Sequence, residues 1–309
     1  MYQTLRAWYI APADSRTISS ARYIKRLDID LTASQRRDWA SQKQTMIGVK
    51  KMQNDDLELK QPQQCDDYNE CSEFVTRAIE AIMQAAIDAG RNQIIINTNL
   101  KLGLPMENIN KIAGPIVEAW AYETFQDVVE DKNNEYRLIN VEAQQRLHMA
   151  DVILQFKKKR KVDSGITAEV DVKATSEDFE SSGKSPNITS FQRIRTAYVE
   201  DPDYIFIILS LKHRVYSTKN EESGLMDEIM EVVAHNAYDL KFLSSSDLSY
   251  NPALGSGQLQ VRDIHYVKLA KRTTWEFCQL LDRKFINSRK GFDEWLTLAK
   301  KNEWIKTDD

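Results

Sequence analysis

The spacing of apolar residues changes near residue 136, and this change constrains the fold more than any other feature. Before it, apolar residues recur at three- and four-residue steps, as on one face of an amphipathic helix. After it come runs typical of strands, at residues 136–141, 151–156, 166–174 and 204–211. The last run, YIFIILSL, is continuously apolar, which indicates a strand buried on both faces. The sequence therefore predicts an α/β protein with a central sheet.

Helical patterns lie on both sides of the predicted strands. Residues 71–89 show the clearest one, and Gly90 follows where a C-terminal cap is expected. A second helix is expected over residues 106–129, where Pro115 could kink it or restart it. Further helices are expected over residues 190–199, 226–242, 275–286 and 292–300, with one more strand near residues 258–264.

Charge and cysteine content exclude few function classes. The net charge of -4 argues mildly against a nucleic-acid partner, but basic residues cluster at 157–161 (KKKRK), 184–195 and 268–290. KKKRK is best interpreted as a solvated turn, with contact to a DNA backbone as the second interpretation. The three cysteines and four histidines show no zinc-binding spacing. No run of about 18 apolar residues and no signal peptide is found, so we expect a cytoplasmic protein without a membrane span.

The segment from residue 150 to residue 175, ADVILQFKKKRKVDSGITAEVDVKAT, carries the candidate chemistry. It reads as two strands joined by a basic turn. Asp151 opens the first strand, and the second contains Glu169, Asp171 and Lys173. Because strand side chains alternate between faces, these three share one face while the valines between them point into the core. Ionisable groups on one face of a central strand are costly unless they have a function.

Phosphodiester hydrolysis would explain that cost. Two carboxylates can hold Mg²⁺, which activates water and neutralises charge on the phosphate, and a neighbouring lysine can orient the attacking water. A D-x-K sequence alone is more often ordinary solubilisation of a strand. Three features favour the nuclease interpretation here: Asp151 lies on a separate strand, the flanking residues are apolar, and a helix with Glu118 precedes the hairpin.

With these residues the chain resembles the PD-(D/E)xK nucleases, and within them the EcoRV/HincII-like type II restriction endonucleases. In that group an Asp begins one strand and (D/E)xK lies on the next; Asp151 and Asp171-Val172-Lys173 match, with Ala150 where a Pro often stands. The resemblance implies that Asp151 and Asp171 bind Mg²⁺ and that Lys173 is catalytic. The helix AGPIVEAWAYETF resembles the family helix whose Glu supplements the metal site, which assigns Glu118 the same role. Glu169 is a weaker metal-ligand candidate, since a basic partner elsewhere would explain it nearly as well.

DNA-binding candidates follow the catalytic strand. The sequence GKSPNITSF resembles the family loop that enters the major groove, and QLQVRDIHYV resembles its C-terminal part. Asn pairs with adenine and Lys donates to guanine, so the loop supplies base-reading candidates. Thr175 and Ser176 could donate to a phosphate, although they suit a turn equally well. The complete set of DNA-binding candidates is Lys184, Ser185, Asn187, Thr175, Ser176 and Arg193.

The resemblance implies a restriction-endonuclease-like core, with a central mixed β-sheet flanked by helices, over residues 101–309. Residues 1–100 are expected to form a helical region that dimerises or wraps DNA. The expected enzyme is a prokaryotic type II restriction endonuclease that cuts both strands of DNA at a short palindrome and leaves 5′-phosphates. Cutting a palindrome calls for a homodimer. The alternatives are a structure-selective or repair nuclease with the same metal site, and a DNA-binding protein that does not cleave.

Overall fold

The computed structural model describes residues 57–145, 148–158, 165–253 and 255–306. All of them belong to one unit of the chain, residues 45–309. The helices expected in residues 1–56 and the basic turn expected at residues 159–164 lie outside the described residues.

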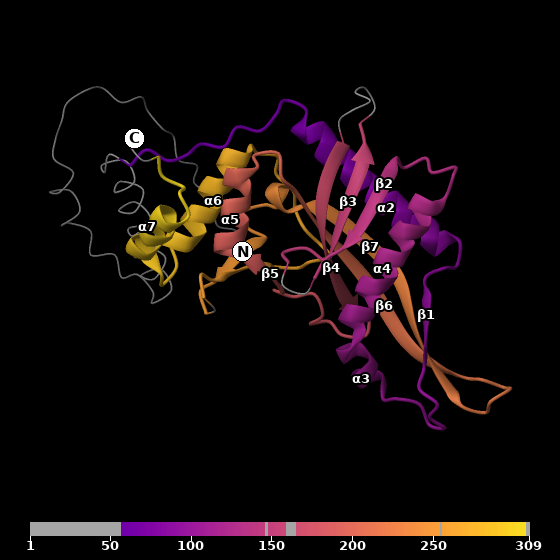
Figure 1. The fold of residues 1–309 in the computed structure, drawn as a ribbon. Helices are drawn as coiled ribbons and strands as arrows, with labels where there is room; N and C mark the ends of the chain where they lie inside the picture. Colours follow the sequence, from indigo (N-terminus) through magenta and orange to yellow (C-terminus); the bar gives the residue numbers. More distant parts are fainter. Residues whose placement is uncertain (1–56, 146–147, 159–164, 254, 307–309) are drawn as a thin grey trace, which may run out of the picture. The chain divides into compact units, whose positions relative to one another are not determined.

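A six-stranded sheet forms the centre of this unit, in the order β1-β7-β6-β4-β3-β2 (Figure 1). Its strands are β1 (Gln93–Asn97), β2 (Leu138–Ala143), β3 (Val152–Lys157), β4 (Gly165–Ser176), β6 (Ile205–Lys219) and β7 (Met226–Asp239). β4 and β6 pair in parallel, while the other neighbouring strands pair antiparallel. The predicted mixed sheet with flanking helices is confirmed.

Helices α2 (Tyr68–Asp88) and α4 (Ala113–Glu130) pack on the sheet, α2 against β7 and α4 against β2 and β4. Their apolar sides share one core with Val170 and Val172 of β4. The helix expected over residues 106–129 is divided at Ile112 into α3 (Met106–Lys111) and α4. Pro115 lies in the first turn of α4, where its missing N–H leaves no helical hydrogen bond unmade.

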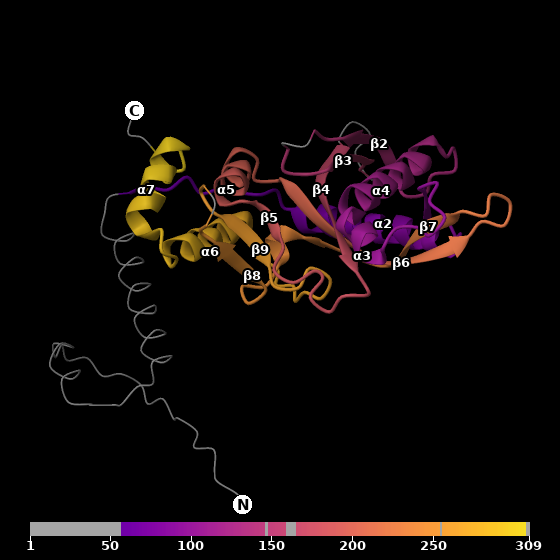
Figure 2. The same cartoon turned by 90° about the horizontal axis from the view of Figure 1, so that it is seen from below.

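A second core lies on the other face of the sheet. It contains Phe206 and Ile208 of β6 together with α5 (Phe191–Glu200), α6 (Thr274–Ile286) and α7 (Gly291–Lys301). A small sheet in the order β5-β9-β8 joins it, formed by β5 (Asn187–Ser190), β8 (Leu248–Asn251) and β9 (Gln258–Val261). Figures 1 and 2 show α5 and α6 across the strands from α2 and α4. The prediction that residues 204–211 are buried on both faces is confirmed.

Two sequence-based expectations are wrong. Residues 226–242 form β7 and a short 3₁₀ helix (Leu240–Phe242), not one helix, because β7 pairs with β6 along its length. Glu228 occupies an inward position of β7, where Leu104 N and Ser217 Oγ donate to its carboxylate, so a charged residue interrupts the apolar alternation of a strand. Residues 57–100 are not helical throughout: they contribute α2 and also β1, an edge strand.

Candidate active site

Asp151, immediately before β3, forms two hydrogen bonds with the neighbouring strand β4. Its backbone N–H donates to the Val170 carbonyl oxygen at 3.0 Å, and its Oδ2 accepts from the Val172 N–H at 2.7 Å. These two bonds bracket Asp171 in the sequence of β4. Asp151 thus lies one residue before β3, which pairs with the β4 strand of Asp171, close to the predicted placement on paired strands.

Asp171 is the most unusual carboxylate on β4. Its side chain is buried, and Lys173 Nζ forms an ion pair with its Oδ1. Its Oδ2 is also buried and has no hydrogen-bond partner. Burial raises the pKa of Asp171 to about 7, helped by the charges of Asp151 and Glu118 and opposed by Lys173. A carboxylate in this setting has one oxygen available for a ligand.

Glu118 reaches the same region from α4. It is half-buried, and its pKa is raised first by burial and then by the charge of Asp151, while Lys173 lowers it. Glu118 and Asp151 line one cavity of about 770 Å³, together with His148 and Tyr122. Four predicted residues, Glu118, Asp151, Asp171 and Lys173, therefore interact electrostatically at one end of the sheet.

Glu169 has a different environment from Asp171. Its Oε2 accepts a hydrogen bond from the Tyr204 hydroxyl. Burial, followed by the charge of Glu169, raises the pKa of Tyr204, and the Tyr204 ring packs against Tyr198 and Phe206. Glu169 is thus held by an aromatic partner that the sequence did not suggest, and it is not among the residues that line the Asp151 cavity.

The donor set fits a hard divalent cation held by few protein ligands. No three His, Cys, Asp or Glu side chains within residues 57–145, 148–158, 165–253 and 255–306 are grouped closely enough to hold an ion. The unbonded, buried Oδ2 of Asp171 and the carboxylate of Asp151 nevertheless lie on adjacent strands. Mg²⁺ retains several waters and binds through one or two carboxylates, so this pair suits it.

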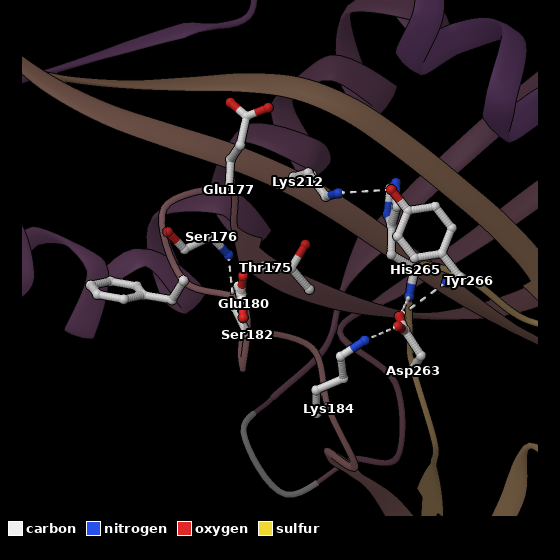
Figure 3. Close-up of a pocket in the computed structure, with 11 residues that line it drawn as sticks. Thr175, Ser176, Glu177, Glu180, Ser182, Lys184, Lys212, Asp263, His265 and Tyr266 are labelled. Atoms are coloured by element: carbon white, nitrogen blue, oxygen red, sulfur yellow. Dashed lines mark hydrogen bonds and ion pairs between the residues drawn. The ribbon is translucent and has the colours of Figure 1, made fainter.

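The DNA-binding candidates separate into three groups. Thr175, Ser176 and Lys184 line a second cavity, of about 420 Å³, at the carboxyl end of β4 (Figure 3). Lys184 forms an ion pair with Asp263 there. Arg193 is exposed on α5, where its backbone N–H donates to the N-cap Ser190, and it does not line this cavity.

Ser185 and Asn187 lie beside β9. Gln260 Nε2 donates to the Ser185 carbonyl oxygen at 3.0 Å and to Asn187 Oδ1 at 3.1 Å. Both residues remain exposed at their own positions. Neither residue lines the second cavity.

Sequence reasoning did not select several residues that line the second cavity, among them Lys212, Asp263, His265 and Tyr266. Lys212 is paired with Thr175 in the β4–β6 register, which the sequence does not reveal. His265 and Tyr266 lie within QLQVRDIHYV, whose resemblance to the family was the available signal.

The chain is similar to known restriction endonucleases. The family model described as Type II restriction endonuclease HpaI matches residues 55–303. The Type II restriction enzyme HpaI of Haemophilus parainfluenzae is 55% identical over 256 residues, which are 82% of this chain and 100% of that protein. Among solved structures, NlaIV restriction endonuclease matches with a TM-score of 0.40 and 12% identity, covering 72% of this chain and 85% of that chain. In the described part of the chain, no helix is both long and apolar enough to cross a membrane.

Proposed function

This chain belongs to the HpaI family of type II restriction endonucleases, and we propose that it cleaves DNA with Asp151, Asp171 and Lys173 at its catalytic centre. The expectation of a type II restriction endonuclease is confirmed, and the matches carry the name HpaI rather than EcoRV or HincII. The proposed reaction is site-specific hydrolysis of both strands of double-stranded DNA, leaving 5′-phosphates.

The observation that carries the site assignment is the state of Asp171. A wholly buried carboxylate with an unbonded oxygen destabilises a fold, because burial of a polar atom without a partner is unfavourable. Its neighbours Lys173 and Asp151 are also ionisable. Such a cluster is typical of a catalytic centre, where groups with altered pKa values are concentrated.

Type II restriction endonucleases generally use divalent metal ions, and we propose Mg²⁺ for this enzyme. Asp151 and Asp171 would hold the ion, and Glu118 would contribute from the adjoining cavity wall. When bound, Mg²⁺ lowers the pKa of a bound water and neutralises charge on the reacting phosphate. Glu169 is left out of this proposed set because Tyr204 already donates to its carboxylate.

The side chains of the chain itself have separate roles in this proposal. The Val172 N–H fixes the orientation of Asp151 through the bond to Oδ2. Lys173 Nζ, beside Asp171, would donate to the attacking water or to a phosphate oxygen and place positive charge where negative charge develops. Glu118 lines the same cavity as Asp151, so its carboxylate would orient a water bound to the ion.

We further propose that the enzyme acts as a homodimer, since a palindromic site presents two equivalent phosphodiester bonds related by a twofold axis. The role of residues 1–100 in dimerisation or DNA wrapping, and a prokaryotic cytoplasmic location, stay predictions. Sedimentation of the full chain with and without DNA would test the dimer. A monomer on a cleaved palindrome would contradict it.

The assay is digestion of plasmid and phage DNA in Mg²⁺, in Ca²⁺ and in EDTA. Discrete fragments in Mg²⁺ alone support the proposed function, whereas nicking confined to flaps or junctions, or binding without cutting in every condition, would refute it. Asp151→Ala and Lys173→Ala should lose cleavage and keep DNA binding in Ca²⁺. Lys132→Ala, an exposed lysine just after α4, is the matched control and should cut normally.

A further inference from the structure

Tyr266 is a large aromatic residue on the surface, 68% exposed, in a turn that fixes its position. The backbone N–H groups of His265 and Tyr266 both donate to Asp263 Oδ1 at 3.1 Å. The His265 ring meets the Tyr266 ring edge-on, with centroids 5.0 Å apart. An exposed aromatic ring with a fixed backbone loses little entropy when it binds a partner, which is why such residues dominate binding surfaces.

The turn before Tyr266 is attached to the central sheet by side chains from two strands. Tyr238 Oη donates to the Ile264 carbonyl oxygen at 3.0 Å, and Asn236 Nδ2 donates to the His265 carbonyl oxygen at 2.8 Å. Ser210 Oγ and His265 Nδ1 are hydrogen-bonded at 3.2 Å. The turn and the sheet therefore form one rigid surface.

This surface adjoins the catalytic strand. Lys173 pairs with Ser210 and Thr175 pairs with Lys212 in the β4–β6 register. Lys212 Nζ donates to Tyr266 Oη at 3.2 Å and lies 5.0 Å from the ring centroid (Figure 3). A tyrosine and a lysine thus lie together only a few residues along the sheet from the proposed catalytic lysine.

Tyr266 lines two cavities of different charge. The second cavity, of about 420 Å³, also contains Glu177 and Glu180. A third cavity, of about 590 Å³, contains Arg262 and Lys268.

The two acids of the third cavity, Asp247 and Asp263, already have hydrogen-bond or ion-pair partners. Asp263 is paired with Lys184, and Asp247 accepts from the Lys268 N–H at 2.7 Å and from Ser244 Oγ at 3.0 Å. The third cavity is therefore basic overall. Carboxylates such as Glu177 and Glu180 of the second cavity accept hydrogen bonds from base amino groups but repel phosphate.

We propose that Tyr266 contacts DNA beside the cleaved bond, with a backbone phosphate in the cavity of Arg262 and Lys268 and base edges toward Glu177 and Glu180. This inference rests on the proposed DNA cleavage and identifies a surface that reads the substrate. Arg and Lys contacts to phosphate position a duplex, whereas contacts to bases and sugars select the sequence. Tyr266 lines both the cavity proposed for the phosphate and the cavity proposed for the base edges.

The test begins by mapping the wild-type cut site through sequencing of digested ends. Duplexes with that site, and with each single-base change, are then titrated in Ca²⁺ against Tyr266→Ala, Arg262→Gln and Lys268→Gln. Tyr216→Ala is the matched control, since Arg214 lies 5.9 Å from the Tyr216 ring on β6, away from both cavities. Thermal unfolding of every variant verifies its fold.

Tyr266→Ala should weaken binding of the mapped site about tenfold, as expected for loss of one aromatic contact to DNA. It should also reduce the difference in affinity between the mapped site and the duplexes with a single-base change. Arg262→Gln and Lys268→Gln should weaken binding to all the duplexes by the same factor. Each should reduce the slope of the logarithm of the binding constant against the logarithm of the salt concentration by about 1. Wild-type binding by Tyr266→Ala, or an unchanged salt slope in both other variants, would overturn the inference. Failure of the wild-type enzyme to cut would instead refute the proposed function.

Discussion

Replacement of Asp171 by asparagine should stabilise the metal-free enzyme and abolish cleavage. The carboxylate is buried and its pKa is raised to about 7 from an ordinary value of 3.8. An acid with a raised folded-state pKa destabilises the fold fully above that pKa, and the cost declines as pH falls toward 3.8. Asparagine has nearly the same shape and no charge to bury.

The magnitude follows from the pKa. A difference of about 3 corresponds to about 4 kcal/mol above pH 7, at 1.36 kcal/mol for each pKa unit. At pH 5 the same relation leaves a cost of about 2 kcal/mol. An amide without a hydrogen-bond partner costs about 1–3 kcal/mol, so the net gain at pH 8 should be about 1–3 kcal/mol. The gain should shrink by about 2 kcal/mol between pH 8 and pH 5.

Urea denaturation in EDTA at the two pH values measures the gain, and plasmid digestion in Mg²⁺ measures activity. Asp282→Asn is the matched control. Asp282 is as buried as Asp171, but Arg195 donates to both its oxygens at 3.0 and 3.1 Å, and Trp295 Nε1 donates at 3.0 Å. The free energy of unfolding of the control should fall by about 3–5 kcal/mol, because the Arg195 guanidinium would remain buried without its counterion.

The two readouts test different steps of the argument. If Asp171→Asn unfolds at lower urea than the wild type at pH 8, the unfavourable burial of Asp171 is contradicted. If the variant is more stable but still cuts DNA, Asp171 is not a catalytic residue. Loss of cleavage should be at least about a hundredfold, comparable to removal of one group that stabilises charge in a transition state.

Three further substitutions test the loop beside the second cavity, the role of Glu169 and a buried lysine of the core. Gly183→Ala should lower the free energy of unfolding by about 1–3 kcal/mol, because φ is +78° and a Cβ there would lie 2.9 Å from Thr175 Cγ2. The substitution should also weaken DNA binding in Ca²⁺. An unchanged urea midpoint would contradict this prediction. Glu169→Gln should cut plasmid near the wild-type rate, since Tyr204 already holds that carboxylate, and a cleavage defect as large as that of Asp171→Asn would return Glu169 to the metal-ligand set. Burial lowers the pKa of Lys241 to about 7, so the folded state binds fewer protons than the unfolded chain from there to about pH 10 and stability should rise between pH 7 and pH 9. Urea denaturation should show a smaller rise in the free energy of unfolding between pH 7 and pH 9 for Lys241→Met than for the wild type. An equal rise in both proteins would refute the lowered pKa of Lys241.

The catalytic strand could be predicted from the sequence because its signal is local. Alternation over β4 places Asp171 and Lys173 on one face, and Asp151 opens the strand beside it. The helix with Glu118 also follows from its own apolar spacing. Each of these inferences uses residues within one or two neighbouring elements.

The strand β7 and the DNA-facing surface could not be predicted in this way. β7 contains the buried Glu228, whose partners Leu104 and Ser217 come from two other segments, so its apolar pattern is incomplete without the fold. The surface around Tyr266 brings β4, β6 and the segment after β9 together. Contacts between distant segments decide both features, and periodicity within one segment does not record them.

Burial alone would not have identified the functional acid. Four aspartates are buried in the described part of the chain: Asp171, Asp239, Asp247 and Asp282. Tyr68 and Ser72 donate to Asp239, Ser244 and the Lys268 N–H donate to Asp247, and Arg195 and Trp295 donate to Asp282. Among these four, only Asp171 has a buried oxygen without a partner. Since structural acids are satisfied by the fold and a ligand-binding acid must keep an oxygen available, hydrogen bonding separates the catalytic candidate from the others.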